Sequence, residues 1–318
     1  MNPVKWILLL FLAAGCDGVQ QSSKVTLPLI EMDVPPGSEV QDCIYFKSPN
    51  ETDVDLSKVT MQFSEGTHHV HVYFSDRPHE DGRESCFQAV DFDRWHLLAA
   101  TQKKDLEWEF PSGVAFRLHA HQQLLIQVHY VNAGMLITEK NKGHGNIHFD
   151  TRAPGEVKSY MGSIFGQQRL IDIQPYANYS VDGICRLPRA VNLAALAGHY
   201  HFKGKQFIAS KLDPGATTGS EFYRTSDFAE PNFDIYKPGQ MTFTAGERIM
   251  WHCDYRNDSD LRISFGPREL TQEHCNMFAF YYPAEKDQEF TPCVSWGRCK
   301  EDCDIGQVCS ELGECVSK

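Results

Sequence analysis

The sequence predicts an all-β protein: two consecutive antiparallel β-sandwich domains followed by a small disulfide-rich C-terminal tail. Short strand-like runs separated by Gly, Pro and Asn follow one another through most of the chain, and only Asp93 to Thr101 has a helical pattern. Many short strands with so little helix are typical of β-sandwiches. Five cysteines then fall within the 23 residues from Cys293 to Cys315, which hold little apolar material. Disulfides must therefore stabilise this tail.

The 318 residues suffice for about two domains, at roughly 100–200 residues each. Runs such as His69 to Phe74 and Leu124 to Tyr130 predict strands in the first domain, and Leu193 to His201 and Arg248 to Tyr255 predict strands in the second. The predicted division is a signal peptide at 1–15, a polar tether at 16–25, an N-terminal domain at 26–152, a C-terminal domain at 153–292 and the tail at 293–318.

The first residues have the pattern of an export signal. Lys5 makes the N-terminal region positively charged, and Trp6 to Ala14 is an apolar run too short to span a bilayer. The run ends in Leu12–Cys16, which resembles the lipobox of bacterial lipoproteins. We therefore expect lipidation of Cys16 and a lipid anchor in the bacterial cell envelope, facing the periplasm or the exterior. The alternative is an ordinary secretory signal in which this cysteine is incidental.

The net charge is −12, and the lysines and arginines form no run or stripe. Phosphate binding needs clustered cations, so the sequence argues against nucleic acid as a partner. It also argues against electrostatic docking to anionic lipid, which leaves the lipid anchor as the expected contact with the membrane.

Ten cysteines remain of the 11 once Cys16 is set aside, an even number in an exported protein. Because the compartment is oxidising, we expect five disulfides and no catalytic thiol. Metal binding by the tail is the alternative for its five cysteines. The tail lacks histidine and paired C-x₂-C spacing, which favours disulfides.

Histidines are the most informative residues. The chain holds 14, and six of them form three His-x-His pairs: His69/His71, His119/His121 and His199/His201. In a strand, residues i and i+2 share a face, so each pair would present two imidazoles to one metal ion. His68 directly precedes the first pair, and His129 lies in an apolar run. Clusters of imidazole alone suit copper or zinc.

Five sequence blocks resemble the type II copper monooxygenases, the ascorbate-dependent family of peptidylglycine α-hydroxylating monooxygenase and dopamine β-monooxygenase. The blocks occur in the family's order and cover roughly residues 35–295. They are Thr67–Val70 (vicinal histidines), Gly113–Arg117 with Gln127–Tyr130 (GxxFR…QVHY), Gly198–Lys205 (HxH-x-x-GK), Ala245–Tyr255 (PGD…C-x-Y) and Glu273–Pro283 (E-M-C-N-x-x-x-x-Y-Y).

The resemblance implies two domains that face each other across an open cleft, each with one copper ion. The first copper would bind His68, His69 and His129, and would store and deliver an electron. The second would bind His199, His201 and one residue near 274, and would react with O₂ and the substrate. The implied reductant is ascorbate or another one-electron donor.

The family's E-M-C motif reads Glu273-His274-Cys275 here, so the thioether ligand is missing. If 274–282 is a strand, His274, Asn276 and Phe278 share one face, and Met277 points away. We therefore predict His274 as the third ligand of the oxygen-activating copper, and His199, His201 and His274 as the catalytic residues. The alternative leaves His274 outside the coordination sphere, with water completing the site.

Two further alternatives concern the remaining histidines. His68 and His69 point oppositely in an ideal strand, so their joint use needs a bulge or twist. The rival first site uses His69 and His71 instead. His119 and His121 have no counterpart in the family, and we expect them on a surface strand. The alternative for them is an additional metal site or support for the first copper.

The resemblance also implies the disulfide pairs Cys43–Cys86, Cys185–Cys293 and Cys253–Cys275. The remaining tail cysteines would then form two bridges among themselves: Cys299, Cys303, Cys309 and Cys315.

The expected function is copper-dependent hydroxylation of a C–H bond in a small, neutral substrate, with O₂ and an external reductant. The peptidyl enzymes of the family place an Arg two residues before their HxH, where this chain has Ala197, and Phe278 replaces a matching Tyr. Asn276 is kept, but alone it cannot neutralise a substrate carboxylate. The alternatives are a non-catalytic copper-binding or copper-handling envelope lipoprotein, and a zinc protein whose three-His site performs hydrolysis.

Overall fold

The computed structural model describes residues 24–28, 30–86, 91–132, 141–285, 290–295, 307–309 and 315–317. The predicted signal peptide lies outside these ranges, and so do Cys16, Cys299 and Cys303. The described residues form strands joined by turns and one short 3-10 turn, Pro154–Glu156, which confirms the all-β prediction. None of their segments is a helix of the length and apolarity that a membrane crossing requires.

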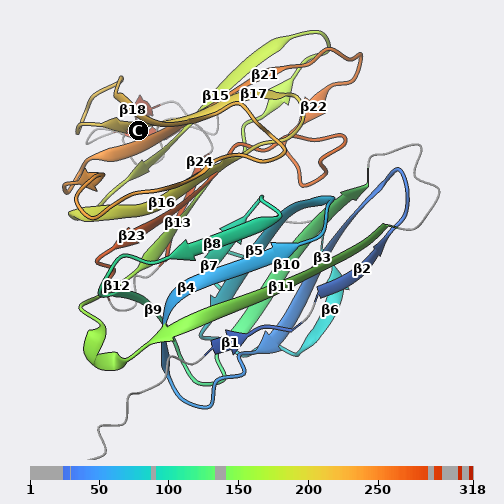
Figure 1. Cartoon of the computed structure of the whole chain (residues 1–318). Coiled ribbons are helices and arrows are strands. Elements are labelled where there is room, and N and C mark those ends of the chain that lie inside the picture. The colour runs from blue at the N-terminus through green and yellow to red at the C-terminus, as the bar shows by residue number, and fades with distance from the viewer. Residues whose placement is uncertain are drawn as a thin grey trace, which may run out of the picture.

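The first half of the chain forms two sheets (Figure 1). One has the order β1 (Lys24–Thr26), β11 (Asn141–Arg152), β4 (Val54–Phe63), β9 (Val114–Leu118) and β12 (Ser159–Tyr160), with β2 (Ile30–Val34) on β11 and β8 (Asp105–Glu109) on β4. The other has the order β6 (Gly82–Ser85), β3 (Ser38–Lys47), β10 (Gln123–Asn132), β5 (Thr67–Ser75) and β7 (His96–Thr101). Pairing is antiparallel except between β12 and β9.

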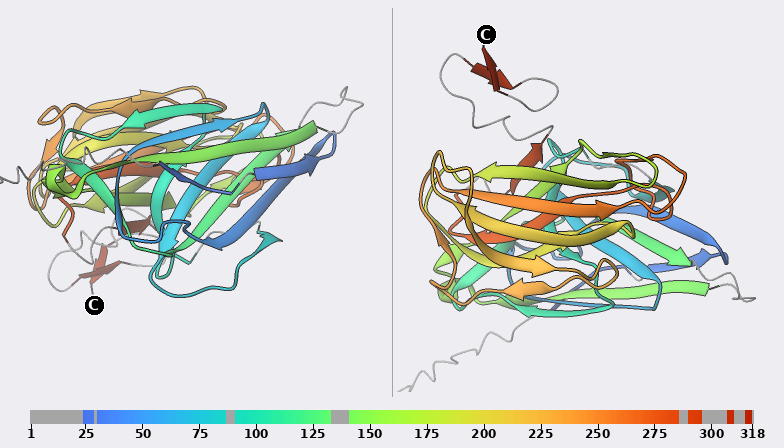
Figure 2. Two further views of the ribbon diagram at one scale, coloured as in Figure 1. Left: turned by 60° about the horizontal axis from the view of Figure 1, so that its bottom comes forward. Right: turned by 90° about the horizontal axis from the view of Figure 1, so that it is seen from above.

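The second half repeats this two-sheet arrangement (Figure 2). Its inner sheet has the order β19 (Phe233–Ile235), β16 (Val191–His199), β23 (Asn276–Tyr282), β13 (Gly162–Gln168) and β24 (Phe290–Ser295), with β20 (Thr242–Phe243) on β16. Its outer sheet has the order β15 (Asn178–Arg186), β21 (Arg248–Arg256), β17 (Gly204–Leu212) and β18 (Ser220–Thr225). Two short pairs complete the fold: β14 (Asp172–Ile173) with β22 (Ile263–Ser264), and β25 (Gln307–Cys309) with β26 (Cys315–Ser317).

Burial explains how the halves meet. β2 and β8 alternate between buried and exposed residues, as strands with one solvated face do. β5, β10 and β23 are buried along almost their whole length, because both faces of these strands are covered. Their sheets cover one another, so one apolar core runs from the first half into β13, β16 and β23, and a second core fills the sandwich of the second half.

The segment with a helical pattern, Asp93 to Thr101, is where the sequence prediction is wrong. Residues 96–101 form β7, which pairs with β5 along Val70–Phe74. Leu97 to Ala100 are all at most 3% exposed, so both of their faces pack. Pairing with a long neighbouring strand outweighs the weak local pattern.

The structure contains the three disulfides that the resemblance implies: Cys43–Cys86, Cys185–Cys293 and Cys253–Cys275. The second of these joins β15 to β24, which places Cys293 in the sheet of the second half rather than in a separate tail. In the short tail pair, Cys309 and Cys315 occupy opposite positions of β25 and β26. The two bridges expected within the tail stay predictions.

Candidate metal centre

The first half presents its histidines from two paired central strands. His68, His69 and His71 lie on β5, and His129 lies opposite His69 on β10. The pairing register shifts between His129 and Tyr130, so a bulge occurs at His68. This is the irregularity that joint use of His68 and His69 requires. Possible ligand atoms of His68, His69 and His129 lie within 4.8 Å of one another.

The second half presents its histidines from strand ends. His199 is the last residue of β16, His201 lies in the turn that follows, and His274 lies just before β23. The His274 ring centroid is 4.5 Å from that of His201 and 5.4 Å from that of His199. The expected strand over 274–282 begins only at Asn276.

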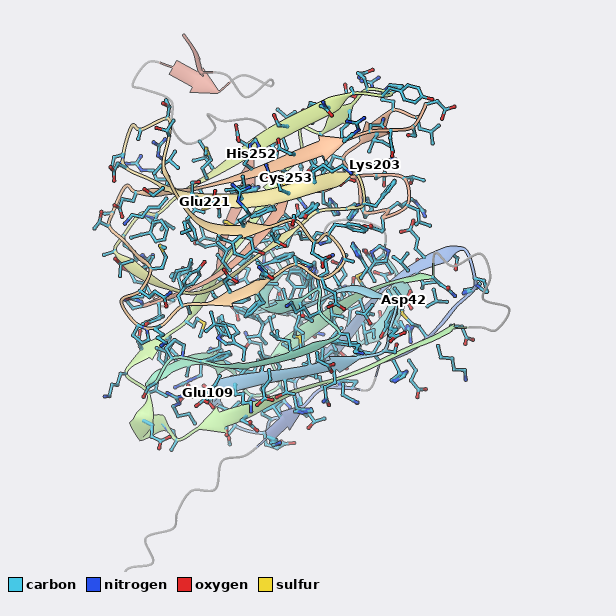
Figure 3. All side chains as sticks on the ribbon, turned by 45° about the horizontal axis from the view of Figure 1, so that its top comes forward. Asp42, Glu109, Lys203, Glu221, His252 and Cys253 are labelled. Carbon is cyan, nitrogen blue, oxygen red and sulfur yellow. A yellow bond between two sulfur atoms is a disulfide. The ribbon has the colours of Figure 1, made fainter. Side chains whose placement is uncertain are left out.

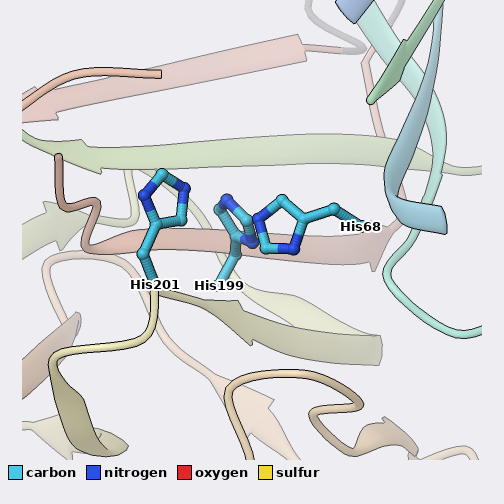
Figure 4. Close-up of side chains that lie close together, drawn as sticks. All are labelled: His68, His199 and His201. Atoms are coloured by element: carbon cyan, nitrogen blue, oxygen red, sulfur yellow. The ribbon is translucent and has the colours of Figure 1, made fainter. Parts of the chain in front are cut away.

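The two sets of rings touch, which differs from the open cleft that the resemblance implied. The His68 centroid lies 5.1 Å from that of His199 and 5.2 Å from that of His201. Possible ligand atoms of these three residues lie within 4.8 Å of one another. Figure 4 shows the three side chains converging from the two halves. The two halves also share an apolar core.

We call the combined group the histidine cluster: His68, His69, His71, His129, His199, His201 and His274. Every member is at most 7% exposed. Burial lowers the pKa of each ring, to about 3 for His68 and about 4 for His201. The rings are therefore neutral near pH 7, the form of imidazole that binds metal ions.

Several ring nitrogens of the cluster fit a bound metal. His69 Nδ1, His71 Nε2, His199 Nε2 and His274 Nδ1 are buried and make no hydrogen bond. Leaving a buried polar atom without a partner costs roughly 1–3 kcal/mol. A metal ion bound by lone pairs would remove this cost at several rings together. Imidazole-only donors are suited to copper and zinc.

Hydrogen bonds on the other side of each ring fix which nitrogen faces the cluster. His199 Nδ1 donates to Gln102 Oε1 at 2.7 Å. His201 Nδ1 donates to the carbonyl oxygen of Gln272 at 2.7 Å, and His129 Nε2 donates to Glu39 Oε2 at 3.0 Å. Partners of this kind orient metal-binding histidines and hold their tautomer.

The turn that carries His201 is held by a buried carboxyl group. Glu273 Oε2 accepts the His201 N–H at 2.9 Å, and its Oε1 accepts the Lys203 N–H at 2.7 Å. Burial raises the pKa of Glu273 to about 8. The turn closes with the Gly204 N–H donating to the His201 carbonyl at 3.0 Å. A Cβ at Gly204 would lie 1.9 Å from the Tyr200 ring, so only glycine fits there.

His71, the rival ligand, lies outside both three-histidine groups. Its ring stacks on His69 with centroids 4.4 Å apart and lies 4.8 Å from the Phe278 centroid. Its Nδ1 is 3.1 Å from the Tyr73 hydroxyl and 3.3 Å from Gln127 Oε1. These contacts place His71 as a packed neighbour of His69.

His119 and His121 lie far from the cluster, in the turn after β9 instead of the surface strand we expected. His121 has a φ of +51°, which a strand does not allow. Both side chains are about half exposed and pair with carboxylates: His119 with Asp53 at 2.9 Å and His121 with Glu51 at 3.1 Å. Both histidines therefore lie at the surface, beside acidic side chains.

A cavity of about 50 Å³ adjoins the cluster. His69, His71, His199 and His274 form one side of it. Apart from Pro267, the remainder is aromatic or amide-bearing and includes Phe92, Phe165, Phe265, Gln167 and Asn276. The described residues that line it include no Lys, Arg, Asp or Glu.

Side chains of β23 alternate between the cavity side and the core of the second half, as the sequence predicted. Asn276 lines the cavity, and the Phe278 ring lies 6.1 Å from that of His199. Met277 is fully buried in the core of the second half, where it packs near Trp251 and Gly166. No thioether from this strand therefore faces the cluster.

Sequence reasoning did not identify Gln102, Glu39, Gln272 or Glu269. Gln102 follows β7, Glu39 lies on β3, and the other two lie in the loop between β22 and β23. None sits in a motif or beside a histidine in the sequence. Pairing of β3 with β10 brings Glu39 to His129, and Gln272 reaches His201 within the second half. Packing of the two halves brings Gln102 to His199 and Glu269 to His68.

Comparison with known proteins finds one family. Residues 160–305 match the model of the copper type II ascorbate-dependent monooxygenase, C-terminal domain. No curated protein matches the chain.

Solved structures give only weak similarity. The PBCV-1 VP54 structure fitted into the virophage Sputnik covers 87% of this chain and 95% of its own, at 8% identity and a TM-score of 0.31. The broad bean stain virus structure covers 86% and 94%, at 7% identity and 0.29. The structure of infectious bursal disease virus Gx strain covers 83% and 73%, at 8% identity and 0.24. Scores this low carry no argument about the fold or the function.

Proposed function

Residues 160–305 belong to the copper type II ascorbate-dependent monooxygenases, and from this premise we propose that the protein hydroxylates a C–H bond of a small, neutral molecule. The observation that carries the proposal is the histidine cluster, with buried ring nitrogens that lack hydrogen-bond partners. Bound copper would supply the redox chemistry with O₂ and electrons from ascorbate or another one-electron donor.

The residues divide into two ligand sets in this proposal. His68, His69 and His129 would hold one copper ion, which would supply electron storage, and the bulge in β5 brings His68 and His69 to the same side. His199, His201 and His274, beside the cavity, would hold the other, which would supply the chemistry with O₂.

Contact between the sets bears on electron delivery. The His69 and His199 ring centroids lie 5.1 Å apart, so an electron would cross only a short distance between the two sets. Gln102 strengthens this contact, since its side chain accepts from His199 and its Nε2 lies 3.5 Å from His68 Nδ1.

The cavity supports a neutral substrate. Its aromatic residues exclude water and bury apolar groups. The amides of Gln167 and Asn276 offer hydrogen bonds without charge. Ala197, where the peptidyl enzymes have Arg, contributes no cation, so this position offers a substrate carboxylate no partner. Efficient amidation of a glycine-extended peptide would contradict this part of the proposal.

A second candidate is a copper-binding envelope protein without turnover. The observation that favours it is the close packing of the cluster, whose members are at most 7% exposed beside a cavity of only about 50 Å³. Metal analysis of protein from its native source, followed by oxygen uptake with a reductant, separates the two. Copper with reductant-dependent uptake supports the enzyme, copper without uptake supports the binding protein, and zinc alone contradicts both.

The proposed location is the bacterial cell envelope, through a lipid on Cys16. Replacing Cys16 by Ser should release soluble or unprocessed protein when membranes are fractionated. Unchanged membrane partitioning of Cys16→Ser would contradict the lipid anchor.

A further inference from the structure

Glu269 is a buried carboxylate at the edge of the histidine cluster that neither ligand set uses. It lies in the loop between β22 and β23 and is 5% exposed. Its Oε2 atom lies 3.0 Å from His68 Nε2 and 3.5 Å from His201 Nε2. His68 belongs to the first half of the chain and His201 to the second, so this oxygen lies where the halves meet.

These three atoms converge without hydrogen bonds. Glu269 Oε2, His68 Nε2 and His201 Nε2 are all buried, and the close approaches lack hydrogen-bond geometry. A buried carboxylate oxygen needs a proton donor or a cation to offset its loss of water. A shared cation would satisfy the oxygen and both ring nitrogens at once.

The spacing suits a metal ion. Bonds of about 2.0–2.2 Å in tetrahedral geometry place ligand atoms roughly 3.3–3.6 Å apart. The distances from Glu269 Oε2 to the two nitrogens, 3.0 and 3.5 Å, lie close to this range. Small shifts of the side chains would complete the geometry.

Glu39 gives an internal contrast. Its Oε2 also lies 3.0 Å from a cluster ring, that of His129, but here the ring donates a hydrogen bond. The same oxygen accepts the backbone N–H of Glu269 at 2.9 Å. Glu39 is therefore satisfied without a metal ion and orients His129, whereas Glu269 Oε2 has no hydrogen-bond partner and lies next to two ring nitrogens.

We propose that His68 Nε2, His201 Nε2 and Glu269 Oε2 form a two-histidine, one-carboxylate site for a divalent first-row cation, which Zn²⁺ represents, across the two halves. The hard carboxylate oxygen favours a divalent ion over Cu⁺. His199, whose possible ligand atom lies within 4.8 Å of those of His68 and His201, is placed to provide a fourth ligand.

An ion at this site ties β5 to the loop before β23. Because it uses His68 from one ligand set and His201 from the other, it competes with the arrangement of one copper in each set. Zinc binding can be measured without turnover, so the test of this site does not depend on the proposed hydroxylation.

Zinc binding to the metal-free full-length protein tests the site, with competition against a chelator. Glu269→Gln should weaken the tightest Zn²⁺ binding at least tenfold and change Cu⁺ affinity less than threefold. Glu39→Gln is the matched control and should change Zn²⁺ affinity less than threefold. Unchanged Zn²⁺ affinity in Glu269→Gln would overturn the proposal, as would equal losses for Zn²⁺ and Cu⁺.

A crystal structure of the zinc-loaded wild-type protein tests the same site without any substitution, so its result does not depend on whether a variant folds. The expected result is an anomalous peak about 2.0–2.2 Å from Glu269 Oε2, with His68 and His201 also bound. Zinc bound only by imidazole nitrogens would contradict the proposed zinc site and would not bear on the proposed hydroxylation. Zinc bound by Glu269 in a protein that hydroxylates no substrate would support the zinc site and contradict the proposed hydroxylation.

Discussion

The two halves hold their histidines in different ways. His69 and His129 sit in mid-strand, opposite each other on β5 and β10, and the sheet itself fixes them. His199 and His201 lie at and beyond the end of β16, where side chains from other elements hold the backbone. We call His68, His69 and His129 the sheet-built set, and His199, His201 and His274 the turn-built set. We expect metal binding by the sheet-built set to survive the loss of a supporting side chain, and metal binding by the turn-built set to depend on it.

The largest effect is expected from removing a ligand of the turn-built set. His201→Ala should lower the copper content by about half and abolish hydroxylation, because the remaining rings of that set no longer enclose an ion. His119→Ala, a surface histidine, is the control and should change neither. Copper analysis and product assay of both purified variants check this. Full activity in His201→Ala would contradict the ligand assignment.

The second-largest effect is expected from removing the Glu273 carboxyl group, which holds the turn that carries His201. Glu273→Ala removes the acceptor of the His201 and Lys203 backbone N–H groups and should lower the free energy of unfolding by about 2–3 kcal/mol. Glu273→Gln keeps one acceptor oxygen and should lose less. Denaturant unfolding of the metal-free proteins measures both. Glu39→Ala removes the carboxyl group beside His129 in the first half. A larger decrease in the free energy of unfolding for Glu39→Ala than for Glu273→Ala would contradict the contrast between the two halves.

Gln102 should affect metal binding more than folding. Gln102→Leu removes the acceptor that holds the His199 tautomer and should weaken copper binding at the turn-built set about 10–100-fold. Gln102→Glu keeps an oxygen for His199 Nδ1 and should retain most of the affinity. Competition titrations with each variant give the result. Equal affinities in the wild type and Gln102→Leu would show that the tautomer is held elsewhere.

The smallest effect concerns His252 on β21, in the outer sheet away from the first half (Figure 3). In contrast to the cluster, its pKa is raised, first by the hydrogen bond to Asp182 and also by Asp254. A raised folded pKa stabilises the protein fully below the unfolded value of 6.5, and this contribution is lost as pH rises through the folded pKa.

His252→Gln should therefore lower the free energy of unfolding at pH 5.5 by no more than about 1 kcal/mol, since the ring is partly solvated. The difference from wild type should shrink by pH 9. Unfolding of both proteins across this range measures it, and a difference that grows with pH would have the wrong sign.

Much of the site follows from the sequence because strand periodicity is local. His68, His69 and His71 all lie on β5 as predicted, whereas His199 ends β16 and His201 lies beyond it. Alternation along β23 separates Phe278 from Met277. Because His68 and His69 point oppositely in an ideal strand, their use at one metal ion predicts a bulge or twist. The shift in register between β10 and β5 confirms it.

The rest depends on packing between distant segments. Gln102 reaches His199, and Glu269 reaches His68, only because the two halves pack together, and no local sequence pattern encodes that packing. The same packing replaces the expected open cleft with rings in contact. His119 and His121 show the opposite failure, since their spacing is that of a strand but their backbone forms a turn.

One measurement tests the central claim most directly. Copper-loaded protein is supplied with ascorbate, ¹⁸O₂ and a panel of small neutral aromatic and aliphatic compounds, and the products are examined by mass spectrometry. The account predicts a hydroxylated product that carries one labelled oxygen atom, formed by the wild type and absent with His201→Ala. Oxygen consumption that yields only peroxide, with no labelled product from any compound, would contradict it.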